Sequence, residues 1–245
     1  MNPRITAAVA ARVLRQLRRD PRTIALMLVV PGVLLTLLWW MFDRNAVAFD
    51  RSGPPLLAMF PFTVMFLVTS VTTLRERSSG TLERLLSMPM GKLDLLLGYA
   101  IAFGLAALAQ ALLAVALTVG LLGLDVVGPV WALGLIAVID AVLGTALGLF
   151  VSAFAETEFQ AVQFMPAVVI PQILLCGLFV PRDDLPRTLN VVSDVLPLSY
   201  AVDAMQSLQK SADMTGGYGV DLLVIVGFIV ASLALGAATL RRRTA

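Results

Sequence analysis

The chain has 245 residues, of which 59% are hydrophobic and 14% are charged, and its formal net charge is +2. A soluble domain carries about 25% charged residues, so this composition excludes an ordinary soluble protein and predicts an integral membrane protein of about six helices. There is no histidine and a single cysteine, Cys176. This excludes a disulfide within one chain, a Cys/His metal cluster and a histidine-dependent catalytic triad.

Lysine occurs only at Lys92 and Lys210. A P-loop needs Gly-Lys-Ser/Thr to hold phosphate and magnesium, and neither lysine stands in that context. If ATP drives this protein, another polypeptide must hydrolyse it.

Residues 4–22 predict a basic amphipathic helix, with Ile5, Val9, Val13 and Leu17 on one face and six arginines on the other. We expect it to lie in the membrane plane, with the apolar face in the acyl boundary and the arginines toward lipid phosphates. A role as a simple topology anchor remains open. Six membrane spans follow, at 24–42, 55–74, 95–122, 130–153, 161–180 and 220–240.

Three features qualify these spans. Trp39 and Trp40 close the first span, where an aromatic belt belongs. Pro61 is expected to kink the second, and Pro166 and Pro171 to kink or break the fifth.

With six spans, thirteen lysines and arginines fall on one side and five on the other. The positive-inside rule then predicts that both chain ends lie in the cytoplasm.

The polar stretch 76–89, ERSSGTLERLLSMP, separates the second and third spans and is flanked by cations. It predicts a short amphipathic cytoplasmic helix that ends at Pro89. Its sequence resembles the E-x-x-x-G-T-L-E-x-L-x-x-x-P signature of ABC-2 type permeases, the membrane subunits of exporters such as those for daunorubicin. The resemblance implies a coupling helix that docks on a separate ATPase. The residues that carry the resemblance are Glu76, Gly80, Thr81, Leu82, Glu83, Leu85 and Pro89. Leu86 is assigned to the same helix because it shares one face with Leu82 and Leu85.

Residues 181–205 contain apolar pieces too short to cross a membrane, punctuated by prolines. By themselves they predict an outer loop with small helices. The same family has a G-x-x-x-P…L-P…L-P-x-x-Y/H-x-x-D pattern here, and the resemblance implies a re-entrant helical hairpin in the outer leaflet. The matching residues include Gly177, Pro181, Pro186, Pro197, Tyr200 and Asp203.

Asp140 is the one carboxylate near the middle of a span, and Gln110 in the third span is its expected partner. Such an acid either lines a transport pathway or packs through hydrogen bonds, and the sequence leaves both open. Gly144 and Gly148 predict close helix packing. Glu156 and Glu158 have no cation near them in the sequence, which predicts a solvated turn.

The whole chain, 1–245, is therefore predicted to form one all-α transmembrane domain, with an interfacial helix, a coupling helix and an outer re-entrant hairpin, as in type V exporters. The expected function is the permease subunit of an ATP-driven exporter of a hydrophobic or amphipathic compound in a bacterial-type cytoplasmic membrane. We expect the chain itself to bind no metal, cofactor or nucleic acid, with ATP and Mg²⁺ on the ATPase.

The expected partners are two ATPase subunits, the lipid bilayer and a second permease, either a copy or a close homologue. A transporter driven by an ion gradient and an intramembrane lipid-modifying enzyme are the alternatives. The former usually shows internal repeats or several buried charges, and the latter a polar catalytic cluster at one depth.

Overall fold

The computed structural model describes residues 2–42, 45–79, 91–211 and 217–239, and every regular element in this part of the chain is a helix. Six of them are long and apolar enough to cross a membrane, which confirms the prediction of an all-helical membrane protein. These are α2 (Pro21–Met41), α3 (Ala46–Ser78), α5 (Lys92–Val115) with its π-helical extension η1 (Ala116–Leu121), α6 (Val130–Ser152), α7 (Glu158–Leu175) and α10 (Tyr218–Thr239). The shorter elements are α1 (Pro3–Arg18), the 3-10 turn η2 (Arg182–Asp184), α8 (Arg187–Asp194) and α9 (Pro197–Lys210).

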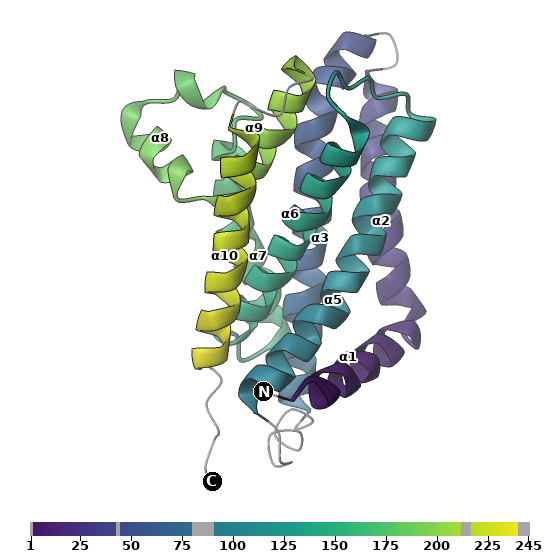
Figure 1. Ribbon diagram of the computed structural model, residues 1–245, viewed down its shortest axis with the longest axis vertical. Helices are drawn as coiled ribbons and strands as arrows, with labels where there is room; N and C mark the ends of the chain where they lie inside the picture. The colour runs from purple at the N-terminus through teal and green to yellow at the C-terminus, as the bar shows by residue number, and fades with distance from the viewer. Residues whose placement is uncertain (1, 43–44, 80–90, 212–216, 240–245) are drawn as a thin grey trace.

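The long helices stand side by side, with α1 lying across one end of the bundle and α8 projecting from the side near the other end (Figure 1). We call these the α1 end and the α8 end. Helices α2, α5 and α7 run toward the α8 end, and α3, α6 and α10 return (Figure 1). Helix α6 is the central span, because 67% of the residues in its most apolar stretch are buried inside the protein. In α2, α7 and α10 the corresponding share is 17%, so these helices turn most of their surface outward.

The closest contact in the bundle is between α3 and α6. A Cβ atom at Gly144 would lie 2.4 Å from the carbonyl oxygen of Phe62, and one at Gly148 would lie 2.6 Å from that of Phe66. Both distances are shorter than any real Cβ contact, so only glycine allows the two backbones to approach this closely. The expected small-residue packing at these two positions is confirmed.

Helix α3 begins nine residues before the predicted span, so Asp50 and Arg51 belong to a helix rather than to a loop. Pro54 lies within this helix and has no N–H to donate to the carbonyl oxygen of Asp50. The side chain of Gln209, from α9, donates to that oxygen at 2.7 Å. A tertiary contact therefore replaces the missing helical bond.

The bounds of the third and fifth spans also differ from those predicted. Helix α5 starts at Lys92, because Asp94 in its first turn accepts a hydrogen bond from the Gly91 amide at 3.2 Å. Helix α7 is continuous through Pro166 and Pro171 and ends at Leu175. Gly177 follows with a φ of +90°, a left-handed conformation that glycine adopts at no steric cost.

Helix α1 forms at the predicted place, but its apolar face packs on protein. Val9, Val13 and Leu17 are at most 9% exposed, and α1 lies against α5. Gly98 of α5 makes room for this contact, since a Cβ there would come within 2.5 Å of the Val9 side chain. The expectation that this face lies in the acyl boundary is therefore wrong for these residues, whereas most of the arginines on the other face are exposed.

Candidate functional site: the end of α3 and its partners

Three consecutive residues at the end of α3, namely Arg75, Glu76 and Arg77, bind four other helices or their ends. We call this triplet the α3 anchor. Successive residues of an α-helix point about 100° apart, so three in a row reach in three directions. Glu76 is the first residue of the predicted coupling stretch, so the anchor lies at its border. The other coupling residues, Gly80, Thr81, Leu82, Glu83, Leu85, Leu86 and Pro89, lie outside the described residues.

Glu76 is the buried member of the anchor, with 4% of its side chain exposed. One carboxylate oxygen accepts a hydrogen bond from the Arg12 guanidinium of α1 at 2.6 Å and another from the Tyr99 hydroxyl of α5. Arg12 also donates to the Tyr99 hydroxyl at 2.7 Å. Burial disfavours the charge of Arg12, but the hydrogen bonds that Arg12 donates to Glu76 and Tyr99, together with the charge attraction of these groups, outweigh burial and raise the pKa of Arg12. The three side chains therefore join α1, α3 and α5 around one ion pair.

The two arginines of the anchor bind α7 and α6. Arg75 donates two hydrogen bonds to Glu158, at 3.0 and 3.2 Å, in an ion pair open to solvent. The prediction that no cation accompanies Glu158 is thus wrong, because Arg75 is distant in sequence but adjacent in the fold. Arg77 donates to the carbonyl oxygens of Ser152, Ala153 and Ala155 at the end of α6. A cation at this position satisfies carbonyls that lack helical partners and complements the helix dipole.

The segment that follows the coupling stretch is held by the same helix α1. Asp94 of α5 accepts hydrogen bonds from the Asn2 amide at 2.8 Å and from the Thr6 hydroxyl at 3.3 Å. Since Arg12 holds Glu76 on the other side, α1 contacts both flanks of residues 80–90. Sequence reasoning missed Arg12, Asp94 and Tyr99 as partners, because their contacts with Glu76, Asn2 and Thr6 join residues far apart in the sequence.

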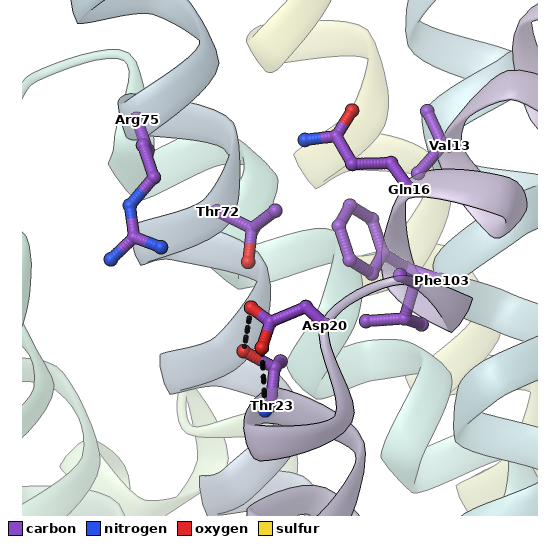
Figure 2. A pocket seen from close by; sticks show the side chains of 8 residues that line it. Val13, Gln16, Asp20, Thr23, Thr72, Arg75 and Phe103 are labelled. Atoms are coloured by element: carbon purple, nitrogen blue, oxygen red, sulfur yellow. Dashed lines mark hydrogen bonds between the residues drawn. The ribbon is translucent and has the colours of Figure 1, made fainter.

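A small cavity of about 40 Å³ lies beside the anchor, lined by residues of α1, α2, α3 and α5 and of the turn between α1 and α2 (Figure 2). Its apolar lining consists of Val13, Leu17 and Phe103, and its polar lining of Gln16, Asp20, Thr23, Thr72 and Arg75. Asp20 accepts two hydrogen bonds from Thr23 in Figure 2, one from the hydroxyl at 2.7 Å and one from the amide at 3.2 Å. These bonds cap α2 and lower the pKa of Asp20.

Asp140 and Gln110 are both buried, at 0% and 1% exposure. Asp140 is the eleventh residue of α6, and Gln110 lies eleven residues before the end of η1, so they lie at about the same depth on adjacent helices. The predicted pairing does not form, because neither side chain has a hydrogen-bond partner among the described residues. Unpaired polar atoms at this depth cost several kcal/mol in hydrocarbon.

At the α8 end, Arg182 holds the segment after α7 together. Its guanidinium pairs with Asp194 of α8 and with Asp203 of α9, and it lies 5.3 Å from the centre of the Tyr200 ring. Tyr200 in turn donates its hydroxyl hydrogen to the Asp194 carbonyl at 2.7 Å. Of the predicted hairpin residues, the structure thus brings Tyr200 and Asp203 together around an arginine that the sequence pattern did not single out.

The remaining hairpin residues shape the chain path. Pro186 and Pro197 stand at the starts of α8 and α9, while Pro181 precedes η2. The Gly177 carbonyl accepts a hydrogen bond from Gln206 at 3.3 Å. The segment is therefore a pair of short helices linked to the bundle, and its immersion in the outer leaflet stays a prediction.

The fold defines a polytopic membrane protein in which α1, α5, α6 and α7 meet at a polar anchor at the end of α3. The family model described as ABC-2 type transporter matches residues 5–210, and the chain belongs to this family. It is 29% identical over 195 residues to the probable multidrug ABC transporter permease YbhS of Escherichia coli, covering 79% of this chain and 50% of that protein. It is 26% identical over 155 residues to YbhR of the same organism, also named a probable multidrug ABC transporter permease, with 63% and 42% covered.

Another relative is the ABC transporter G family member 20 of Dictyostelium discoideum, 26% identical over 168 residues, which cover 68% of this chain and 23% of that protein. The chain thus spans about half the length, or less, of the curated relatives that it matches.

Proposed function

We propose that the chain is the permease subunit of an ATP-driven ABC exporter, with the α1 end in the cytoplasm. The observation that carries this proposal is the α3 anchor, which borders the predicted coupling stretch and binds α1, α5, α6 and α7. A displacement of the coupling stretch by an ATPase acts on these helices together. Rigid-body movement of packed helices is a common route by which nucleotide state changes a membrane pathway.

The partners follow from this assignment. The sequence contains no Gly-Lys-Ser/Thr, so ATP and Mg²⁺ belong to a separate ATPase subunit, present in two copies. Two permeases, either identical or closely homologous, enclose the pathway, for which the outward faces of α7 and α10 offer surface. The apolar spans and the names of the relatives support a hydrophobic or amphipathic cargo over a large polymer.

The energy source can be tested in inside-out membrane vesicles from cells that make the chain with a partner ATPase. We expect uptake of a fluorescent amphipathic dye with ATP, no uptake with a non-hydrolysable ATP analogue, and little change when an ionophore collapses the ion gradients. Replacing Gly80 or Glu83 with leucine should reduce uptake at least tenfold at equal membrane content, while Glu156→Gln, an exposed carboxylate at the α1 end, should keep it. Uptake that survives the analogue and stops with the ionophore would favour a gradient-driven transporter instead.

We propose that Asp140 lines the transport pathway and contacts the cargo there. Asp140→Asn keeps the shape of the side chain and removes its charge, so it should reduce export of a cationic dye about tenfold more than export of a neutral one. If Asp140 only packs, asparagine should be nearly silent and Asp140→Leu should lower the folded yield. Vesicle uptake of both dyes, normalised to the amount of protein in the membrane, separates the two roles.

A further inference from the structure

The outward face of α2 carries a stripe with an arginine at one end and a tryptophan at the other. Arg22, Leu26, Val29, Val33, Leu37 and Trp40 recur every three or four residues and therefore share one side of the helix. All are exposed, and the apolar members are between 48% and 71% exposed. The stripe extends over about 27 Å at 1.5 Å per residue, close to the roughly 30 Å of a hydrocarbon core.

This length assigns each end of the stripe to a membrane interface. If the apolar side chains face acyl chains, Trp40 lies at one headgroup level and Arg22 at the other. Arg22 does not stand alone there, since Arg18 and Arg19 end α1 immediately before the turn into α2. All three arginines are exposed, and none of them forms an ion pair among the described residues.

The one carboxylate in this corner does not neutralise the arginines. Asp20 is held by Thr23 at the start of α2, where its charge complements the helix dipole. The corner of residues 18–22 thus presents three guanidinium groups and a single engaged carboxylate. Guanidinium forks match the oxygen atoms of a phosphate, and the adjoining stripe matches a hydrocarbon chain.

We propose that Arg18, Arg19 and Arg22 form a binding site for the phosphate of an anionic phospholipid in the leaflet at the α1 end, with its acyl chains along Leu26 and Val29. A membrane lipid fits better than an acidic protein, because the arginines continue directly into an apolar stripe of bilayer length. The site adjoins the α3 anchor, since Asp20 of this corner and Arg75 of the anchor line the same cavity (Figure 2). A bound lipid therefore holds the α1–α2 corner beside the anchor.

The test uses the full-length protein, purified in a neutral detergent and titrated with phosphatidylglycerol or phosphatidylcholine, with bound lipid counted by native mass spectrometry. The variant Arg18→Gln/Arg19→Gln/Arg22→Gln is compared with the control Arg51→Gln/Arg187→Gln/Lys210→Gln, which removes three exposed cations at the α8 end. Thermal unfolding in phosphatidylcholine verifies that both variants fold. Each arginine near an anionic surface contributes about fivefold in affinity, so the first variant should bind phosphatidylglycerol roughly 100-fold more weakly.

The proposal requires that the control bind phosphatidylglycerol as the unmodified protein does, and that phosphatidylcholine bind all three proteins alike. Equal losses in both variants would reduce the effect to general charge attraction and overturn the site. Displacement of the lipid by millimolar inorganic phosphate would assign the arginines to a soluble anion. Unchanged lipid binding with loss of dimer in the first variant would assign the stripe to a second copy of the chain, and each of these results overturns the proposal.

Discussion

Replacing Glu76 with alanine is expected to remove coupled transport and to destabilise the fold by about 2–4 kcal/mol. In the unmodified protein the Arg12 guanidinium and the Tyr99 hydroxyl donate to the same carboxylate oxygen of Glu76. The variant removes this shared acceptor. Tyr99 is only 3% exposed and Arg12 is 29% exposed, so water reaches the arginine but hardly the tyrosine. Thermal unfolding of the purified protein measures the stability effect, and dye uptake into vesicles measures transport.

The neighbouring ion pair of the α3 anchor supplies the control for Glu76. Arg75, one residue before Glu76 in α3, forms the same type of ion pair with Glu158 of α7, but the two side chains are 58% and 49% exposed. An exposed pair contributes about 0–1 kcal/mol, so Glu158→Gln should change the unfolding temperature little. A double-mutant cycle of Arg12→Gln with Glu76→Gln should show coupling of at least about 1 kcal/mol. If Glu76→Ala unfolds at the same temperature as Glu158→Gln, the anchor has no special structural role.

Gly144→Ala is expected to lower the amount of folded protein in the membrane more than any other single methyl addition on α6. The new Cβ would lie 2.4 Å from the backbone oxygen of Phe62, and a backbone atom within a packed helix cannot rotate away. The α3 and α6 backbones must then separate, and the contacts of the fully buried Phe62 and Phe66 loosen. We expect a cost of about 3 kcal/mol or more, at the upper end for overpacking.

Gly134, on the same helix, provides the matched control for this substitution. A Cβ at Gly134 meets no atom within 4 Å, so Gly134→Ala should be neutral or slightly stabilising through helix propensity. Folded yield and thermal unfolding in a mild detergent compare the two variants directly. Equal behaviour of Gly134→Ala and Gly144→Ala would show that the α3–α6 contact yields more easily than its geometry implies.

The position of α1 extends the proposed coupling mechanism. Through Arg12, Asn2 and Thr6, this helix contacts the chain before and after residues 80–90. Its apolar face lies on α5 rather than on lipid, so a movement of the coupling stretch acts on α1 as a packed element. The arginine corner at the end of α1 then connects the same unit to the membrane surface.

The membrane character and the number of candidate spans were predictable from the sequence. A run of about 20 apolar residues must form a helix in a bilayer, because the hydrocarbon offers no other hydrogen-bond partner for the backbone. The spacing of Gly144 and Gly148 likewise predicted close helix packing. The ends of the spans were less predictable, since α3 continues through Pro54, where the side chain of Gln209, far away in the sequence, bonds the carbonyl that the proline leaves without a helical donor.

The polar contacts were decided by the tertiary structure. Arg12 with Glu76, Arg75 with Glu158, and Arg182 with Asp203 join residues that are between 21 and 83 positions apart, and no local period encodes such pairs. Asp140 and Gln110 show the converse, because equal depth on adjacent helices suggested a bond that the packed side chains do not form. Hydrophobicity and helix period act locally and so can be read along the chain. Which polar side chains meet depends on how the finished helices rotate and pack against one another, and only the fold determines that.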